Sequence, residues 1–275
     1  MTDILNLKKQ AATIRKLTIK AMEAAGYGHI GGSMSIVDAL SVLYYGIMNI
    51  DPKNPNKFDR DRLVLSKGHC GPALYATLAS IGYFPIKELA TLNANGTSLP
   101  SHCDRLKTKG IDISTGSLGQ GLSLASGVAY GCRMQNLDSF VFCIVGDGEL
   151  QEGQNWEAIQ FIAHNNLNNL ILIVDNNKRQ LDGYTEQICK QYDLSEKLSS
   201  FGLKTYSVNG HDTEAIYNTL IEAKKSSLPT AVILETEKGH GCCFAEIDGF
   251  NHYMVIDKEM SNKACCDIER RLCDE

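Results

Sequence analysis

The 275-residue sequence predicts a doubly wound α/β fold, in which helices flank a mainly parallel sheet. Two short apolar runs carry this prediction, "FVFCIV" at 140–145 and "LILIVD" at 170–175. Neither run alternates with polar residues, which is typical of strands buried on both faces of a parallel sheet. The helical stretch from Gln154 to His164 joins the runs into a strand–helix–strand crossover. In such folds, ligands bind at the carboxyl ends of the strands.

The first half of the chain is predicted to be mostly helical. Apolar residues at three- and four-residue steps predict a helix over 3–25. A glycine-rich break is expected at 26–33, and a second helix should begin near Ser35. The elements expected next are a strand at 62–66, a helix at 71–83 and a helix of small residues at 119–134.

The second half repeats the alternation of strands and helices. A strand is expected at 206–208, a helix at 213–225 and a strand at 231–237. Because no repeat, low-complexity tract or flexible linker interrupts the sequence, residues 1–256 are predicted to form one domain. The charged stretch 257–275 is interpreted as a C-terminal tail, either a surface helix or frayed.

The composition is that of a soluble globular protein, with 43% apolar and 21% charged residues. A net charge of −5 offers no basic surface for nucleic acid or an anionic membrane. The N-terminus is too polar for a signal peptide, and no apolar run is long enough to cross a bilayer. The ten cysteines show no C-x-x-C spacing, so reduced thiols and a cytoplasmic location are expected.

Polar residues follow the two apolar runs directly. Asp147 lies in "VFCIVGDGELQEG" and Asn177 in "DNNK". If the two strands are neighbours, these side chains meet at one edge of the sheet, where carboxylate and amide oxygens suit Mg²⁺ or Ca²⁺. Gly146 and Gly148 allow a sharp turn and leave backbone N–H groups for phosphate oxygens. Each motif alone is a common turn, but their combination after two core strands indicates a metal and phosphate site.

The pair of motifs resembles the thiamine diphosphate signature, and "GDGELQEGQNWEAI" with "VDNNKRQLDG" is similar to transketolases in particular. Four further stretches agree with that family, in its order: "GHIGGSMS" at 28–35, "LSKGHCGPALYA" at 65–76, "LPSHCD" at 99–104 and "ISTGSLGQGLS" at 113–123. The resemblance extends from about residue 10 to about residue 252. It implies the thiamine diphosphate-binding fold, and specifically its diphosphate-binding domain.

The resemblance also implies the cofactors and the residues that hold them. Mg²⁺, or Ca²⁺ or Mn²⁺ in its place, would bridge the diphosphate to the side chains of Asp147 and Asn177 and the main-chain carbonyl of Arg179. The residues implied in binding thiamine diphosphate are His69, Gly116, Ser117, Leu118, Gly146, Asp147, Gly148, Glu149, Asn177 and His252. Glu152 matches a glutamate of a hydrogen-bonded network at the subunit interface.

Three histidines match active-site histidines of the family: His29, His69 and His102. They would bind substrate hydroxyls and move protons, which suits a side chain that titrates near neutrality. His252 is a fourth candidate, but the family usually has glycine after this histidine, whereas Tyr253 follows it here. His252 is therefore either catalytic or a histidine of a surface loop.

In this family, the glutamate that activates the cofactor belongs to a second, pyrimidine-binding domain, which would begin beyond residue 275. The chain is therefore expected to be the N-terminal subunit of a split transketolase. It would transfer a two-carbon ketol unit from a ketose phosphate to an aldose phosphate, as in the pentose phosphate pathway. Its partner would be a separately encoded C-terminal subunit, in an α2β2 heterotetramer.

Three alternatives remain open at the level of the sequence. The chain could belong to a transketolase-like enzyme of a specialised sugar pathway that acts on an unusual ketose phosphate or a sulfosugar. It could be the α subunit of another split thiamine diphosphate enzyme, of the 2-oxo acid dehydrogenase type. It could also be a non-catalytic relative, although the metal ligands and three histidines argue against this.

Overall fold

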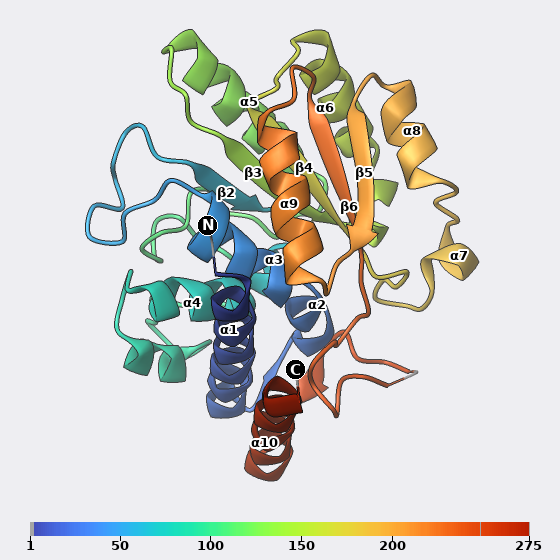
Figure 1. The fold of residues 1–275 in the computed structure, drawn as a ribbon. Coiled ribbons are helices and arrows are strands. Elements are labelled where there is room, and N and C mark those ends of the chain that lie inside the picture. The colour runs from blue at the N-terminus through green and yellow to red at the C-terminus, as the bar shows by residue number, and fades with distance from the viewer. Residues whose placement is uncertain (1–2, 248, 275) are drawn as a thin grey trace.

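A parallel five-stranded sheet forms the centre of the protein (Figure 1). The computed structural model describes residues 3–247 and 249–274. The strand order is β2-β3-β4-β6-β5. The strands are β2 (Arg62–Leu65), β3 (Val141–Gly146), β4 (Leu170–Asn176), β5 (Lys204–Asn209) and β6 (Thr230–Glu235). The predicted strands are thus confirmed, with bounds that differ by a few residues.

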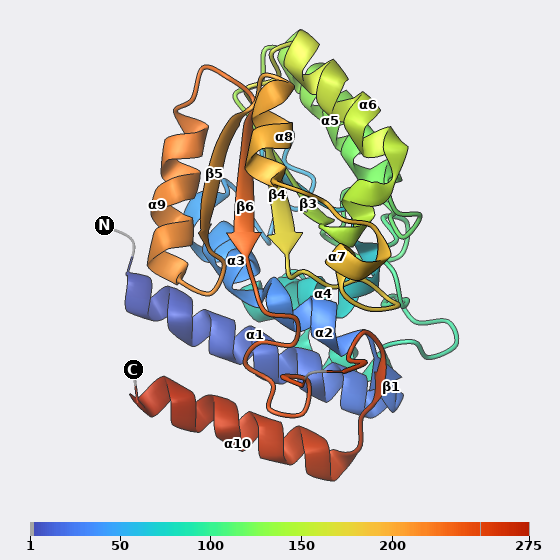
Figure 2. The same ribbon diagram turned by 90° about the vertical axis from the view of Figure 1, so that its right-hand side faces the viewer.

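Strands β3 and β4 are neighbours, as the sequence predicted. Their ladder runs from Val141 opposite Leu170 to Gly146 opposite Asp175. The residues that follow both strands therefore emerge at the same edge of the sheet. Strands β4 and β6 point toward α2 (Ile30–Ser35) at this edge (Figure 2).

Helices cover both faces of the sheet, which confirms the doubly wound fold. One face is covered by α5 (Gln120–Met134), α6 (Gly153–His164) and α8 (Leu194–Ser200). The opposite face packs against α1 (Ile4–Ala25), α3 (Val37–Val42), α4 (Gly71–Ile81) and α9 (Thr213–Lys224). The predicted helices at 3–25, 71–83, 119–134, 154–164 and 213–225 are all present.

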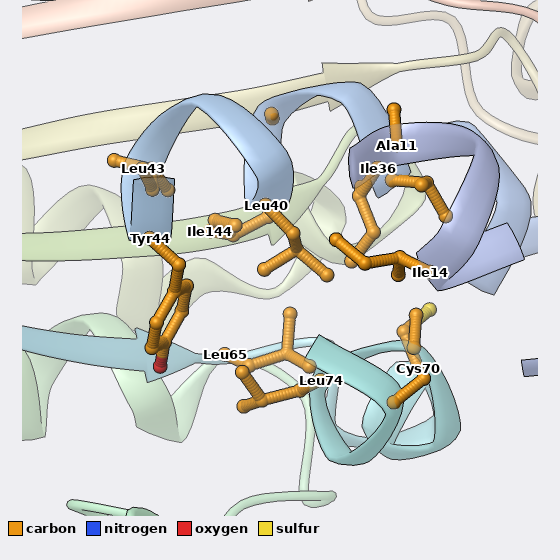
Figure 3. Close-up of a cluster of buried hydrophobic side chains, with 14 of the residues drawn as sticks. Ala11, Ile14, Ile36, Leu40, Leu43, Tyr44, Leu65, Cys70, Leu74 and Ile144 are labelled. Atoms are coloured by element: carbon orange, nitrogen blue, oxygen red, sulfur yellow. The ribbon is translucent and has the colours of Figure 1, made fainter. Parts of the chain in front are cut away.

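The two faces explain why the central strands are apolar throughout. Phe142 and Ile144 of β3 pack into the core under α1, α3 and α4, part of which Figure 3 shows. Val141, Cys143 and Val145 point the other way, into the core under α5 and α6. Successive side chains of the strand thus point into opposite cores. Because both cores are apolar, a polar residue is unfavourable at every position of the strand.

The predicted break at 26–33 is wrong for most of its length. Gly26 ends α1 in a left-handed conformation, with φ of 82°, but Ile30 begins the short helix α2. Glycine is needed at positions 31 and 32 of this helix because other segments approach the backbone closely there. A Cβ on Gly31 would lie 2.4 Å from the carbonyl oxygen of Asn251. The helix expected near Ser35 begins instead as α3 and continues into a π-helical turn, Leu43–Ile47.

Segments from the two ends of the described chain lie side by side. β1 (Tyr27–Gly28) pairs antiparallel with β7 (Met254–Val255). Helix α10 (Lys258–Asp274) lies along α1 (Figures 1 and 2), where Lys16 Nζ and Glu269 Oε1 are 2.9 Å apart and Ile268 is buried. The charged C-terminal stretch is therefore a helix on the surface and not a frayed tail. The proposed division of the chain after residue 256 remains a prediction.

Several short elements have no counterpart in the sequence prediction. They are β1, β7, α2, α7 (Thr185–Ile188), α8 and the 3₁₀ turns Gly68–Cys70, Ile86–Thr91 and Gly148–Gln151. None of the described helices combines the length and the apolar character that crossing a membrane requires. All ten cysteines are free thiols, including the doublets at 242–243 and 265–266.

Burial in the central sheet predicts which side chains contribute most to the stability of the fold. Phe142 is fully buried, so Phe142→Ala should lower the free energy of unfolding by about 3–5 kcal/mol, measured by urea denaturation. Phe58 is 60% exposed, and Phe58→Ala should change it by less than about 0.5 kcal/mol. Equal losses for the two variants would contradict the assignment of Phe142 to the core.

Candidate functional site

A cavity of about 390 Å³ lies at the carboxyl edge of the sheet. It collects residues from the ends of β2, β3, β4 and β6 and from the segments around β1 and β7. The lining residues are His29, Gly32, Lys67, His69, His102, Gly116, Leu118, Gly146, Asp147, Gly148, Glu149, Gln151, Glu152, Asn177, Arg179, Gln180, Leu181, Lys238 and His252. The structure therefore brings together every predicted site residue except Ser117, which is exposed and does not line the cavity.

Asp147 and Asn177 meet where β3 and β4 end. Oδ1 of the buried Asp147 accepts the N–H of Gly148 at 2.8 Å, whereas its Oδ2 has no hydrogen-bond partner among the described residues. The amide of Asn177 donates to Oδ2 of Asp175 at 2.9 Å, and its Oδ1 accepts the N–H of Arg179 at 3.1 Å. The oxygens of Asp147 and Asn177 are the hard donors that Mg²⁺ prefers.

The electrostatics of Asp147 indicate that a positive charge belongs beside it. Burial, together with the negative charge of the nearby Asp175, raises the pKa of Asp147 to about 7. A buried carboxylate with one unpaired oxygen is costly unless it is paired or binds a metal. The residues present thus fit a divalent cation. The role of the Arg179 carbonyl as a third ligand remains a prediction.

The glycine turn between β3 and α6 leaves room for a ligand. A Cβ on Gly146 would meet nothing closer than 3.8 Å, so the space beside it is open. A Cβ on Gly148 would lie 2.8 Å from Cβ of Gln180, so glycine is required for that close approach. The start of α6 adds the favourable field of a helix N-terminus for an anion. The open space suits a diphosphate, but the prediction of available N–H groups in this turn is wrong. The N–H of Gly146 donates to Glu149, that of Asp147 to the carbonyl of Asp175 and that of Gly148 to Asp147.

Glu149 has a structural role that its sequence motif did not reveal. Its carboxylate accepts hydrogen bonds from Ser66 Oγ and from the N–H groups of Gly119 at 3.0 Å and Gly146 at 3.1 Å. Burial raises the pKa of Glu149 despite these three donors. The side chain therefore ties three loops of the cavity together, and its predicted contact with the cofactor remains a prediction.

Four histidine rings form a cluster on one wall of the cavity. The ring centroid of His29 lies 5.5 Å from that of His69, 5.6 Å from that of His102 and 5.3 Å from that of His252. Burial is the main cause that lowers the pKa of all four, to about 4 for His29 and about 3 for His252. The rings are therefore neutral at pH 7, so each can both donate and accept a hydrogen bond.

The β1–β7 ladder decides the position of His252. Gly28 pairs with Met254, so His29, which follows β1, and His252, which precedes β7, come to lie next to each other. His252 is thus part of the cavity and is not a histidine of an outer surface loop. The ring of Tyr253 stands edge-on to that of His29, with centroids 5.1 Å apart. The catalytic role of His252 remains a prediction.

The remaining predicted residues lie on the open side of the cavity. Gly116 has φ of 141°, and a Cβ there would lie 2.9 Å from the ring of His102. Leu118 is 40% exposed, and Glu152 is exposed. Their exposure agrees with the expectation that another protein surface covers this side, although the interface role of Glu152 is untested.

Two lysines of the cavity were missed by the sequence prediction. Lys67 is buried, and its ion pair with Asp175 raises its pKa although burial alone would lower it. Lys238 is also buried, and its Nζ lies 3.3 Å from the carbonyl oxygen of Gln180 and 3.2 Å from Nδ1 of His252. Burial and the charge of Lys67 lower the pKa of Lys238 to about 8. No carboxylate in the described part of the chain forms an ion pair with Lys238, so it is available to an anionic group.

Comparison with known proteins agrees with this site. The family model described as "Transketolase, thiamine diphosphate binding domain" matches residues 7–256. A 6-deoxy-6-sulfo-D-fructose transketolase subunit of a Clostridium species is 47% identical over 267 residues, which cover 97% of each chain. One of the subunits of an apulose-4-phosphate transketolase, from Actinobacillus succinogenes, is 37% identical, with 87% of each chain covered.

A solved transketolase structure from Campylobacter jejuni superimposes on 98% of the chain with a TM-score of 0.91 and 33% sequence identity. The chain spans only 43% of that structure's length. Fold and site together define the diphosphate-binding domain of a thiamine diphosphate-dependent enzyme. Within this class, the chain belongs to the transketolase family. This decides against the 2-oxo acid dehydrogenase alternative and supports a catalytic role over a non-catalytic one.

The shifted Lys238 predicts a pH-dependent stability of the ligand-free chain. Its folded pKa of about 8 lies below its ordinary value of 10.5, so the unfolded chain binds more protons between these values and stability rises with pH there. Lys238→Met removes this penalty. It should stabilise the chain by about 2–3 kcal/mol at pH 7, a gain that disappears above about pH 10.

Denaturant unfolding at several pH values measures this effect. The control is Lys225→Met, whose side chain is 66% exposed, and it should change stability by less than about 0.5 kcal/mol. A Lys238→Met variant that is no more stable than the parent chain at pH 7 would show that Lys238 is well solvated.

Proposed function

We propose that the chain is the diphosphate-binding subunit of a split transketolase, which transfers a two-carbon ketol unit from a ketose to an aldose. The unpaired, buried Oδ2 of Asp147 beside Asn177 carries this proposal, because it fits the Mg²⁺ of a bound diphosphate. Thiamine diphosphate supplies the nucleophilic centre that this chemistry requires. The Clostridium and Actinobacillus relatives are named as subunits, and this supports a separate partner subunit for this chain.

The chain's own residues have three tasks in this proposal. Asp147 and Asn177 would hold the metal, and the open space beside Gly146 would admit the diphosphate. The neutral rings of His29, His69, His102 and His252 accept hydrogen bonds from sugar hydroxyls, donate hydrogen bonds to them and move protons between them. Lys238 supplies a cation that meets an anionic oxygen in the cavity.

The substrate we favour is a sulfonated ketose. The relative that acts on 6-deoxy-6-sulfo-D-fructose, by its name, is 47% identical across nearly the whole chain, against 37% for the apulose-4-phosphate relative. A ketose phosphate that serves as a ketol donor in the pentose phosphate pathway is the second candidate substrate. We also propose an α2β2 assembly in the cytoplasm; the exposure of Leu118 and Glu152 beside the cavity and the relatives named as subunits support a second protein there, and the free thiols of the chain support the location.

Reconstitution tests the activity and the substrate. The purified chain should show little ketol transfer, and activity should appear on mixing it with its C-terminal partner, thiamine diphosphate and Mg²⁺. 6-Deoxy-6-sulfo-D-fructose should be a better donor, by kcat/KM, than fructose 6-phosphate or apulose 4-phosphate. Robust turnover by the single chain would overturn the split architecture, and a preference for a phosphate donor would overturn the sulfosugar assignment.

Removal of the carboxylate tests the metal site. Asp147→Ala should weaken Mg²⁺-dependent binding of thiamine diphosphate to the assembled enzyme by more than about 100-fold, since it removes a direct ligand and not an outer-shell partner. Titration calorimetry measures the affinity. Asp138→Ala, which changes an exposed aspartate of a loop, is the matched control and should leave it unchanged. Unchanged affinity in Asp147→Ala would remove Asp147 from the site.

A further inference from the structure

Asp175, the first residue of "DNNK", is a buried carboxylate to which the sequence analysis assigned no role, and it lies directly behind the proposed metal site. Asp175 is the second-last residue of β4 and is fully buried, at 0% exposure. Its two oxygens accept hydrogen bonds from four side chains: Ser35 Oγ at 2.7 Å, Asn177 Nδ2 at 2.9 Å, Lys67 Nζ and Thr236 Oγ1. All its partners are side chains of buried residues, so the carboxylate is sealed from solvent.

Each donor belongs to a segment that supplies a residue of the cavity. Lys67 precedes His69 by two residues, and Thr236 precedes Lys238 by two. Ser35 ends α2, the helix that begins directly after His29. Lys67 Nζ also donates to the carbonyl of Gly32 at 3.3 Å, within the same helix. One carboxylate therefore connects the chain segments that carry His29, His69 and Lys238.

The contact between Asp175 and Asn177 has a direct consequence for the metal site. An ionised carboxylate only accepts hydrogen bonds, so the nitrogen of the Asn177 amide must face Asp175. The amide oxygen then points the other way and is presented as a ligand atom. The N–H of Arg179 donates to this oxygen at 3.1 Å and opposes the same rotation. Loss of the Asp175 acceptor therefore weakens the preference for presenting oxygen over nitrogen, which does not bind Mg²⁺.

We propose that Asp175 is a positioning residue for the metal site. Together with the N–H of Arg179 it fixes the orientation of the Asn177 amide, and it fixes the relative placement of the segments around the cavity. The proposal rests on the metal site of the proposed function. It assigns to Asp175 no contact with substrate, cofactor or metal.

The test uses the assembled enzyme with saturating thiamine diphosphate and Mn²⁺ as the probe. Asp175→Leu, which has a similar shape but no hydrogen-bond acceptor, should weaken Mn²⁺ binding by about 10- to 100-fold, the range for outer-shell partners of metal ligands. The relaxation rate of water protons per bound Mn²⁺ should rise, because water replaces the lost amide oxygen. A purely structural role would lower stability but would not add water to the metal.

Asp175→Leu leaves the buried charge of Lys67 without a partner, and this alone can prevent folding. Thr236→Val is the second variant, since it removes one hydrogen bond from Asp175 but preserves side-chain shape and the Lys67 ion pair. It should weaken Mn²⁺ binding several-fold. The matched control is Thr77→Val, a change of another buried threonine whose hydroxyl donates to the carbonyl of Ala73 within α4. It should leave Mn²⁺ binding unchanged.

The outcomes separate this proposal from the proposed function. If the parent enzyme binds Mn²⁺ and a folded Asp175→Leu variant binds it within twofold, with unchanged proton relaxation, the positioning role is overturned and the metal site stands. If Asp175→Leu does not fold, unchanged Mn²⁺ binding in Thr236→Val overturns the role. If the parent enzyme binds no Mn²⁺ at all, both the metal site and the positioning role are overturned.

Discussion

The parallel pairing of β3 with β4 is the constraint on which the site depends. Because Gly146 lies opposite Asp175, the residues after both strands emerge together at one edge of the sheet. A slip of one residue would turn every side chain of one strand to the other core. Both cores are apolar, so polarity alone does not exclude that slip; the close packing of side chains of different size and shape in each core does. Burial of the sheet therefore fixes the distance between Asp147 and Asn177, although neither residue belongs to the apolar core.

The cavity holds charges that the protein itself does not balance. Asp147 has an unpaired oxygen, and the Lys238 ammonium lies between a carbonyl and an imidazole. Both arrangements destabilise the ligand-free chain, in contrast to the Lys67–Asp175 pair deeper inside, whose charges compensate each other. The four histidines of the cavity are neutral, so they add no unpaired charge. The protein thus contains a buried ion pair that supports the fold and, next to it, unpaired charged groups that lower stability but are available to a ligand. Such an exchange of stability for function is common at binding sites.

The sequence predicted the parts of the structure that depend on local patterns. Apolar runs and helical periodicity located the sheet and the long helices, and the two motifs placed Asp147 and Asn177 correctly. Helix α2 was missed because its glycines were interpreted as a break in the helix. Gly31 is needed instead for the close approach of the remote Asn251, which the local sequence does not reveal. Lys238 was missed because nothing in its neighbouring residues separates a buried lysine from an exposed one. The apolar run before Asp175 indicated its burial, but not its hydrogen-bond partners. The roles of both residues depend on tertiary contacts between distant segments.

The two-residue ladder between β1 and β7 has a consequence for how the enzyme forms. It joins segments from near the two ends of the described chain. Closing so long a loop costs more conformational entropy than closing a short one, before any contact across it has formed. The strands that position Asp147 and Asn177 are joined by a far shorter crossover. During folding, the phosphate-binding edge should therefore assemble early, whereas the wall that holds His29 beside His252 closes late.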